Sequence, residues 1–216
     1  HEIKNPLTPI QLTIDRLKSK YSEKIADHEK DDFSKSLLII GKQIKQIENL
    51  VNEFSDFARM PKPILKDNNL VSLIKDNIKL TNELDNKIII DFNIGKSEIL
   101  LNSDSEQLSR VFFNLIKNSI ESIQDKKIDN ADLMGKIDIS INENDEKINF
   151  IIIDNGLGFG IFADNIRNIL NPYFTTKKKG TGLGLSIVNK IINDHNGKIN
   201  FVSLDDGAKI EIMFIK

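Results

Sequence analysis

The sequence contains no cysteine and only three histidines, His1, His28 and His195. A chain without cysteine can form neither a disulfide framework nor a thiolate metal site, and three scattered histidines argue against a histidine-rich metal centre. We interpret His28 and His195 as structural or surface residues. Stability must come from an apolar core, which a hydrophobic content of 39% over 216 residues can supply for one large domain or two small ones.

Long apolar runs and an excess of charge of one sign are missing as well. No run approaches the roughly 20 residues that a helix needs to span a bilayer, and no secretory signal is present. Lys and Arg number 30 against 32 Asp and Glu, so the net charge of −2 gives no reason to expect a nucleic acid as a partner. Since the chain starts at His1 without a methionine, we expect the cytoplasmic portion of a longer protein. Any contact with the inner membrane would be made by the upstream region.

Apolar residues in the N-terminal part follow a heptad pattern. They recur at alternating intervals of three and four residues, as Ile3, Leu7, Ile10, Ile14, Leu17 and Tyr21, and again as Phe33, Leu37, Ile40, Ile44, Ile47, Val51, Phe54 and Ala58. This seam predicts two helices that need a partner along their whole length, joined by the polar connection Ala26–Asp32. Two antiparallel helices make half of a four-helix bundle, so we expect a homodimer through this helical hairpin. A coiled-coil spacer without chemistry is the alternative.

A second domain is predicted to follow the stretch Arg59–Pro63, whose two prolines end the helical pattern. The domains are then 1–60 and 61–216. In the second, helices are predicted over 70–84, 106–123 and 182–195, strands over 88–94, 99–101, 137–141, 148–153, 198–203 and 209–215, and loops over 124–135 and 156–181. This order predicts an α+β sandwich, with one mixed sheet and its helices on a single face.

The chain opens with the heptapeptide HEIKNPL. Ile3 and Leu7 lie on the seam, so His1 is expected to face solvent beside the bundle. A neutral imidazole is a good phosphoryl acceptor near neutral pH, because its unperturbed pKa is about 6.5. Glu2 can hydrogen-bond the ring N–H and fix its tautomer, and Asn5 shares a helical face with His1. An exposed histidine beside a glutamate is usually incidental, so the whole heptapeptide carries the signal.

Two asparagines, Asn114 and Asn118, lie one helical turn apart on the helix predicted over 106–123. An amide carbonyl is a hard, neutral oxygen that suits Mg²⁺, which binds few protein ligands and keeps its waters and substrate phosphates. Judged by itself, this pair is more often two solvated asparagines, because the chain is rich in asparagine.

The motif DNGLG at Asp154–Gly158 directly follows an apolar strand. An aspartate at a strand end can accept a hydrogen bond from a nucleobase amino group, and the glycines let backbone approach a ligand closely. As a turn signal the motif is ordinary.

A second glycine-rich motif, GTGLGL at Gly180–Leu185, opens the last helix. Free N–H groups and the dipole of a helix N-terminus make such a turn a ready phosphate site. The motif lacks the Lys-Ser/Thr ending of a Walker loop and does not follow a strand as a Rossmann fingerprint would. Upstream, Asn171–Lys177 (NPYFTTK), with Lys178 and Lys179, supplies an aromatic anchor and three cations for a lid over a triphosphate. Taken alone, a run of lysines is more often part of a solvated loop than a phosphate contact.

In this order and spacing, the four motifs, with the NPYFTTK segment before the last of them, resemble the H, N, first glycine, F and second glycine boxes of bacterial sensor histidine kinases. The resemblance covers essentially the whole chain. It implies a dimerisation and histidine-phosphotransfer hairpin over 1–60, then a catalytic ATP-binding domain of the GHKL (Bergerat) type over 61–216. HEIKNPLTPIQL with NPYFTTK and GTGLGL is most similar to the nitrogen-regulation, NtrY-like subclass. The family implies an enzyme that autophosphorylates a histidine from Mg-ATP and passes the phosphoryl group to an aspartate of a response-regulator receiver domain. It can also act as phosphatase of that regulator.

Carried over position by position, the resemblance implies roles for single residues. His1 would be the phosphoacceptor, Glu2 its assisting acid–base residue, and Asn5 would position water during dephosphorylation. Asn118 would coordinate Mg²⁺, with Asn114 near the phosphates. The other residues expected to bind ATP are Asp154, which would read the adenine amino group, the pocket and lid residues Gly156, Gly158, Thr175, Gly180, Gly182, Leu183 and Gly184, and the phosphate contact Lys177.

Some positions depart from the family pattern. Ala208 stands where the family often has threonine, so a hydrogen bond on the adenine side is expected to be lost. Asn196 replaces the first glycine of a common His-Gly-Gly turn, and asparagine tolerates the left-handed conformation. Asn171 replaces an acidic residue, and Phe159–Ile169 fits the family poorly. These departures concern the conformation of the lid more than the activity.

Two other functions share part of this evidence. A GHKL ATPase of another kind, gyrase-like or of the mismatch-repair type, would have the same pocket but no use for His1 in a heptad hairpin. A non-catalytic signalling scaffold would bind nucleotide and sequester or dephosphorylate the regulator.

Overall fold

The computed structural model describes residues 7–22, 24–159, 168–175, 177 and 180–216. The chain falls into two compact units, divided between Met60 and Pro61. Within the described part, no helix combines the length and the apolarity that crossing a membrane requires. His1, Glu2 and Asn5, the three residues predicted for phosphoryl acceptance, lie outside the described residues.

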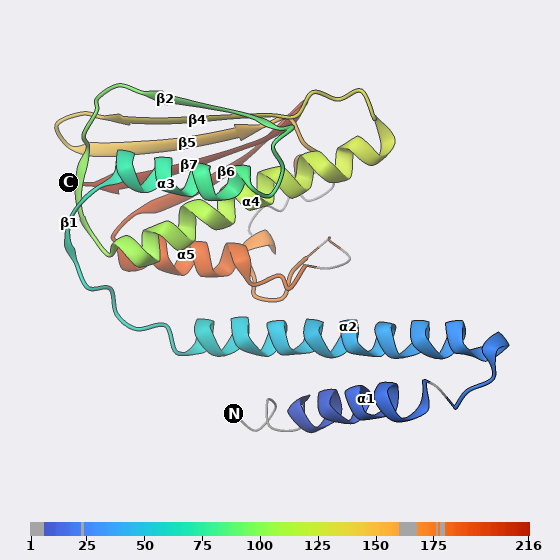
Figure 1. Cartoon of the computed structure of the whole chain (residues 1–216). Helices are drawn as coiled ribbons and strands as arrows, with labels where there is room; N and C mark the ends of the chain where they lie inside the picture. The colour runs from blue at the N-terminus through green and yellow to red at the C-terminus, as the bar shows by residue number, and fades with distance from the viewer. Residues whose placement is uncertain (1–6, 23, 160–167, 176, 178–179) are drawn as a thin grey trace. The chain divides into compact units, whose positions relative to one another are not determined.

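The first unit is a helical hairpin of α1 (Leu7–Tyr21) and α2 (Asp27–Ala58) (Figure 1). Its small core consists of the buried side chains Ile14, Leu37 and Ile44, with Leu7 and Phe33 packed against them. All five belong to the predicted heptad seam, so the pattern correctly identified the residues that join the two helices.

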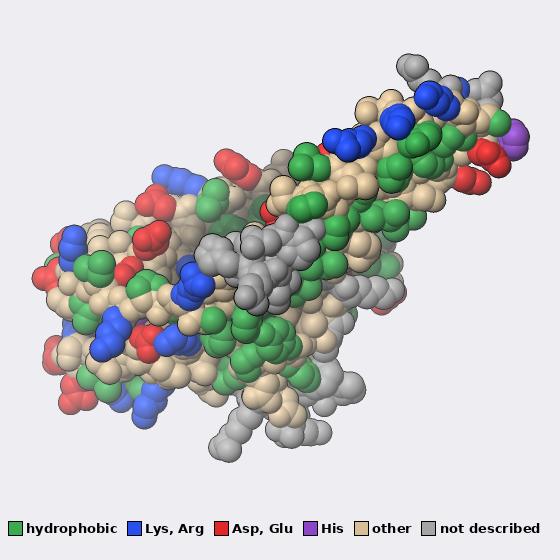
Figure 2. Space-filling view, turned by 90° about the horizontal axis from the view of Figure 1, so that it is seen from below, with side chains coloured by type: hydrophobic (Ala, Val, Ile, Leu, Met, Phe, Trp, Pro, Cys, Tyr) green, Lys and Arg blue, Asp and Glu red, His purple; other side chains and the backbone are tan. Residues whose placement is uncertain are grey.

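The other half of the seam is exposed on the hairpin. Ile10 is 45% exposed, Leu17 37%, Ile40 45% and Ile47 43%. Figure 2 shows hydrophobic side chains exposed along the hairpin. A heptad seam alternates between two sets of positions, and here one set packs within the hairpin while the other faces outward.

The connection between the two helices is shorter than predicted. We expected it over Ala26–Asp32, but α2 already begins at Asp27. The residues from Asp27 to Asp32 (DHEKDD) are rich in carboxylates, which the positive end of the helix dipole favours in the first turns of a helix. The polarity of this segment was therefore not sufficient evidence of a loop.

The second unit contains a five-stranded sheet in the order β2-β4-β5-β7-β6. The strand pair β2–β4 is parallel and the other three pairs are antiparallel. The strand bounds are Ile89–Ile94 for β2, Lys136–Glu143 for β4, Lys147–Asp154 for β5, Lys198–Leu204 for β6 and Gly207–Ile215 for β7. The predicted mixed sheet is thus present.

Three helices cover one face of this sheet, with α4 between α3 and α5 (Figure 1). They are α3 (Leu70–Asn82), α4 (Ser105–Asp129) and α5 (Gly184–Asp194). α4 supplies the centre of the core, where the fully buried Phe112 packs against Phe150 of β5 with ring centroids 5.0 Å apart. The result is a sandwich of one mixed sheet with its helices on a single face, as the order of the elements predicted.

Two details of the second unit differ from the prediction. The segment predicted as a strand over 99–101 is β3 (Leu100–Ser103), which pairs with the unpredicted strand β1 (Lys66–Asn69) in a separate two-stranded sheet. The loop predicted from Gln124 is helical up to Asp129. The residues QDKKID are polar but compatible with a helix, and α4 continues through them.

The alternation of β5 sets the position of the site. Ile148, Phe150, Ile152 and Asp154 are buried, while the residues between them are only partly covered. Successive side chains of a strand point to opposite faces of its sheet. Asp154 therefore continues the row of side chains that points into the core beneath α4.

Candidate functional site

Asp154 is a buried carboxylate held by three hydrogen-bond donors. The residue is only 5% exposed. Its carboxylate accepts hydrogen bonds from the Ser119 hydroxyl at 2.9 Å and the Gly156 N–H at 3.0 Å. The N–H of Ala208, opposite Asp154 in the β5–β7 ladder, donates to it as well. Burial raises the pKa of Asp154 above its ordinary value, and the three hydrogen bonds offset this only in part.

A close crossing of backbone lies beside Asp154. Gly207 has φ +104°, and a Cβ on it would lie 1.8 Å from the carbonyl oxygen of Asp154. Gly158 has φ +68°, and its Cβ would lie 2.5 Å from the carbonyl oxygen of Gly207. Only glycine fits these two positions. The turn after β5 is consequently packed tightly against the start of β7.

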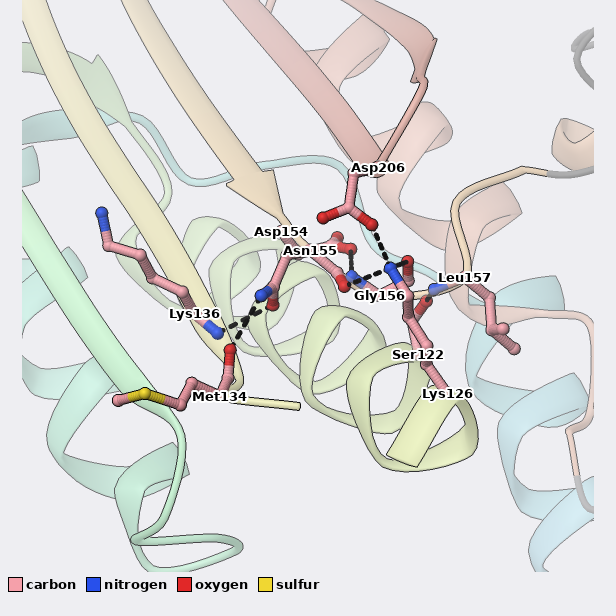
Figure 3. Close-up of polar contacts among 9 residues, drawn as sticks. All are labelled: Ser122, Lys126, Met134, Lys136, Asp154, Asn155, Gly156, Leu157 and Asp206. Carbon is pink, nitrogen blue, oxygen red and sulfur yellow. Dashed lines mark hydrogen bonds and ion pairs between the residues drawn. The ribbon is translucent and has the colours of Figure 1, made fainter. Parts of the chain in front are cut away.

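A polar network fixes the turn after β5 onto α4 (Figure 3). The ammonium of Lys126 donates to the carbonyl oxygens of Asn155 at 2.9 Å and Gly156 at 3.0 Å, and pairs with Asp206. Ser122 accepts a hydrogen bond from the N–H of Leu157 at 2.9 Å. A Cβ on Gly156 would lie 2.4 Å from the Ser122 hydroxyl oxygen, so that glycine permits the contact.

Asn155 has a structural part in the DNGLG motif. Its side-chain oxygen accepts from the N–H of Lys136 at 2.8 Å, and its amide nitrogen donates to the carbonyl of Met134 at 2.8 Å (Figure 3). These two bonds hold the first residue of β4, and Met134 before it, against the end of β5. The asparagine thus supports the turn and uses its amide within the fold.

Sequence reasoning missed the α4 residues that contact this turn. Ser119, Ser122 and Lys126 recur at intervals of three and four residues, which places them on one helical face. That spacing was a usable signal. What the sequence alone did not supply was the partner, since Asp154 lies 35 positions from Ser119.

The two predicted asparagines are half-buried on α4 and face the glycine-rich segment. The amide oxygen of Asn118 accepts from the Lys177 ammonium at 3.4 Å. The amide oxygen of Asn114 lies 4.0 Å from the place that a Cβ on Gly184 would take, at the first residue of α5. α4 therefore contacts the buried carboxylate of Asp154 through Ser119, and its two asparagines lie near Lys177 and the N-terminus of α5.

The GTGLGL turn is built around Gly182. This residue has φ +70°, its carbonyl accepts from the N–H of Tyr173 at 3.1 Å, and a Cβ on it would lie 2.4 Å from the Tyr173 carbonyl carbon. Leu183 is fully buried, and α5 begins at Gly184, two residues after the predicted start. The buried leucine anchors the turn so that the first N–H groups of α5 are presented in a fixed position.

Thr175 and Lys177, two further residues predicted to bind ATP, lie shortly before this turn. The Thr175 hydroxyl accepts from the N–H of Lys177 at 3.1 Å, and the N–H of Gly180 donates to the Lys177 carbonyl at 3.1 Å. The Lys177 ammonium forms an ion pair with Glu121 at 2.5 Å. Sequence reasoning did not identify Glu121. Lys178 and Lys179, the other predicted cations of the lid, lie outside the described residues.

The departures from the family pattern have visible consequences. Ala208 is buried opposite Asp154, where its methyl group cannot donate a hydrogen bond. Asn196 has φ +55° and follows the end of α5, and the N–H of Gly197 donates to the Ile192 carbonyl at 2.8 Å. This is the left-handed helix end that we predicted asparagine would tolerate.

The two remaining histidines have no part in this site. His28 is exposed on the hairpin. His195 is buried, its Nδ1 lies 2.8 Å from the Ile191 carbonyl oxygen, and its Nε2 accepts from the N–H of Asp104 at 3.0 Å. It therefore ties the end of α5 to the N-cap of α4.

The site combines three chemical features along α4. A buried carboxylate, Asp154, can accept hydrogen bonds at one end, and backbone N–H groups at the start of α5 can bind an anion at the other. Between them lie the neutral oxygen of Asn118 and the carboxylate of Glu121, both in contact with the cationic Lys177. Hard oxygens that already hold a cation fit Mg²⁺, and the residues present therefore suit this ion.

Comparison with known proteins agrees with this arrangement. The family model of histidine kinase-, DNA gyrase B- and HSP90-like ATPases matches residues 103–216. The model of the His kinase A phospho-acceptor domain matches residues 1–63.

Individual relatives are similar over nearly the whole chain. A putative sensor histidine kinase NtrY-like protein of Rickettsia prowazekii is 37% identical over 215 residues, which cover 99% of this chain and 34% of that protein. The nitrogen regulation protein NtrY of Azorhizobium caulinodans is 36% identical over 207 residues, covering 96% and 26%. The chain thus spans about a third of the length of the first of these curated relatives and about a quarter of the second.

A solved structure also matches the full chain. The histidine kinase ThkA, in complex with response regulator protein TrrA, has a TM-score of 0.70 and 25% identity, and the match covers 100% of this chain and 59% of that one. These matches agree with the resemblance to the nitrogen-regulation subclass seen in the sequence. With a phospho-acceptor domain followed by a histidine kinase-like ATPase domain, the chain belongs to the sensor histidine kinases.

Proposed function

We propose that this chain transfers the γ-phosphoryl group of Mg-ATP to His1, and from there to an aspartate of a response-regulator receiver domain. In the first step a ring nitrogen of His1 forms a bond to the γ-phosphorus. The bond from phosphorus to the bridging oxygen breaks, and ADP leaves with that electron pair. Glu2 accepts or shares the ring proton.

The buried carboxylate of Asp154 is the observation that carries the proposal. A nucleobase amino group is a donor, and Asp154 is an acceptor whose position three protein donors already fix. A preorganised acceptor loses little on binding, because its orientation does not have to be ordered again. Such a residue at the end of β5 supports recognition of adenine.

The phosphate end of the proposed site is formed by Lys177, Asn114 and the N-terminus of α5. Phosphoryl transfer asks for positioning and charge neutralisation more than for covalent chemistry by the protein. Asn118 would hold Mg²⁺, which neutralises charge on the phosphates when bound. Gly180, Gly182 and Leu183 hold the turn that presents the N–H groups of α5.

The partners follow from the helical hairpin and from the relatives. The exposed half of the heptad seam supports a homodimer. The response regulator in the ThkA structure supports a receiver domain as the acceptor of the phosphoryl group. Asn5 would position water when the same protein dephosphorylates its regulator. We also propose that an upstream region anchors the full-length protein in the inner membrane.

Incubation with ATP labelled in its γ-phosphate tests the first step. We expect label on the protein that is acid-labile and base-stable, and that disappears in His1→Gln while persisting in the control His28→Gln. Asn118→Ala should abolish Mg-dependent labelling without loss of helical circular dichroism.

Other outcomes separate the rival functions. A wild-type protein that binds ATP but stays unlabelled favours a nucleotide-binding scaffold. ATP hydrolysis that continues unchanged in His1→Gln, with no label on the wild-type protein, favours a GHKL ATPase of another kind. Labelling at the wild-type rate in Asn118→Ala would contradict the role of Asn118 in metal binding.

A further inference from the structure

Glu121 lies one helical turn beyond Asn118 on α4. Residues three apart on a helix are neighbours on its surface, and both side chains reach the same cation. The Lys177 ammonium is 2.5 Å from a carboxylate oxygen of Glu121 and 3.4 Å from the amide oxygen of Asn118. Two oxygens on α4 therefore converge on one positive charge.

The contact is accessible and weakly held. The side chain of Lys177 is 30% exposed and that of Glu121 is 35% exposed, so solvent screens the ion pair. A second cation, the ammonium of Lys117, lies 3.8 Å from the other oxygen of Glu121 and comes from the same helix. Glu121 therefore has a neighbouring positive charge on each oxygen, and a stronger cation could replace either of them.

We propose that Glu121 is a ligand, directly or through one water, of the divalent cation that Asn118 binds. This inference rests on the proposed function. A carboxylate is a stronger ligand for Mg²⁺ than the neutral amide of Asn118, because the ion prefers hard, charged oxygens. The Lys177 ammonium now occupies the place between these two oxygens. The metal displaces it, and the freed ammonium turns to the phosphate oxygens of the nucleotide.

The exchange explains why a carboxylate is tolerated beside a phosphate site. A glutamate next to a triphosphate would repel it unless a cation lay between them. In this arrangement one cation always faces Glu121, first the ammonium of Lys177 and then the divalent metal. Glu121 thus makes the binding of nucleotide dependent on the metal.

Binding of Mn²⁺, used as a paramagnetic probe of the site, tests the proposal. The full chain is saturated with a non-hydrolysable ATP analogue, and free Mn²⁺ is measured by electron paramagnetic resonance. We expect the Mn²⁺ dissociation constant to rise by about tenfold or more in Glu121→Gln. The control Asp125→Asn removes the same charge from an exposed position one turn further along α4 and should leave the constant unchanged.

A second variant separates metal binding from an effect through the lysine. In a Lys177→Met background, Glu121→Gln should still weaken Mn²⁺ binding by a similar factor. If the effect vanishes in that background, Glu121 acts only as the partner of Lys177, and the proposal is overturned. Unchanged Mn²⁺ affinity in Glu121→Gln would overturn it as well, while the proposed function would stand. A wild-type chain that binds no nucleotide would contradict the proposed function itself.

Discussion

The hydroxyl of Ser119 donates a hydrogen bond of 2.9 Å to the carboxylate of Asp154, and so joins the middle of α4 to the end of β5. Both residues are buried, Ser119 to 2% exposure and Asp154 to 5%. The bond connects the helix that carries both site asparagines with the strand that carries the proposed adenine acceptor.

Replacing Ser119 by alanine should weaken both stability and nucleotide binding. The change removes one of three donors to a buried charge, and an under-satisfied buried group costs about 1–3 kcal/mol. We expect a loss of that size in urea unfolding and a several-fold weaker binding of ATP by calorimetry. Ser105→Ala, at the exposed start of α4, is the matched control and should change neither quantity by much. Wild-type affinity in Ser119→Ala would show that Asp154 is positioned without this bond.

The free energy of unfolding should depend on pH through the titration of Asp154. Burial raises its pKa above the ordinary value of 3.8, so the folded state holds this proton more tightly than the unfolded state does. The resulting stability is fully present below about pH 3.8 and is lost as the pH rises through the higher folded pKa.

Asp154→Asn removes this titration. The free energy of unfolding of the variant minus that of the wild type should therefore increase as the pH rises from about 3.8, and level off above the folded pKa. Denaturant unfolding at a series of pH values measures this difference. A difference that stays constant across the series, or that falls as the pH rises, is incompatible with a raised pKa.

Several local features were predicted from the sequence because each depends on residues that lie close together in the chain. The DNGLG motif predicted an aspartate at the end of an apolar strand, and Asp154 is the last residue of β5. The three–four spacing in α1 and α2 predicted the residues that join the hairpin. Asn196 was expected to tolerate a left-handed conformation, and its φ of +55° agrees. In each case a short stretch of neighbouring residues determines the result.

The parts that were missed depend on contacts between distant segments. The strand β1, Lys66–Asn69, reads KDNN and has no apolar alternation, so only its pairing with β3 makes it a strand. The ion pair of Lys177 with Glu121 joins residues 56 positions apart. Local patterns contain no information on such pairs, since they arise from the packing of α4 against the glycine-rich turn.

Replacing Gly207 by alanine should severely destabilise the second unit. A Cβ there would lie 1.8 Å from the Asp154 carbonyl oxygen, on a residue with φ +104°. We expect a loss of about 3 kcal/mol or more in the free energy of unfolding. The control is Gly95→Ala, whose Cβ would meet only the exposed side chain of Asn142 at 3.1 Å, and its effect should be below about 1 kcal/mol. Equal stabilities of the two variants would mean that the crossing near Asp154 relaxes easily.

The exposed half of the heptad seam predicts how the hairpin associates. Ile40 and Ile47 lie one heptad apart on the seam and are 45% and 43% exposed. Burying an isoleucine contributes about 1.5–3 kcal/mol, so changing both to lysine should weaken a homodimer by at least about 100-fold. Analytical ultracentrifugation should show a dimer for the wild type and a monomer for the double variant. Ile39→Lys, equally apolar and 59% exposed but one position off the seam, should remain a dimer. If Ile39→Lys dissociates and the seam variant does not, the dimer uses another face of α2.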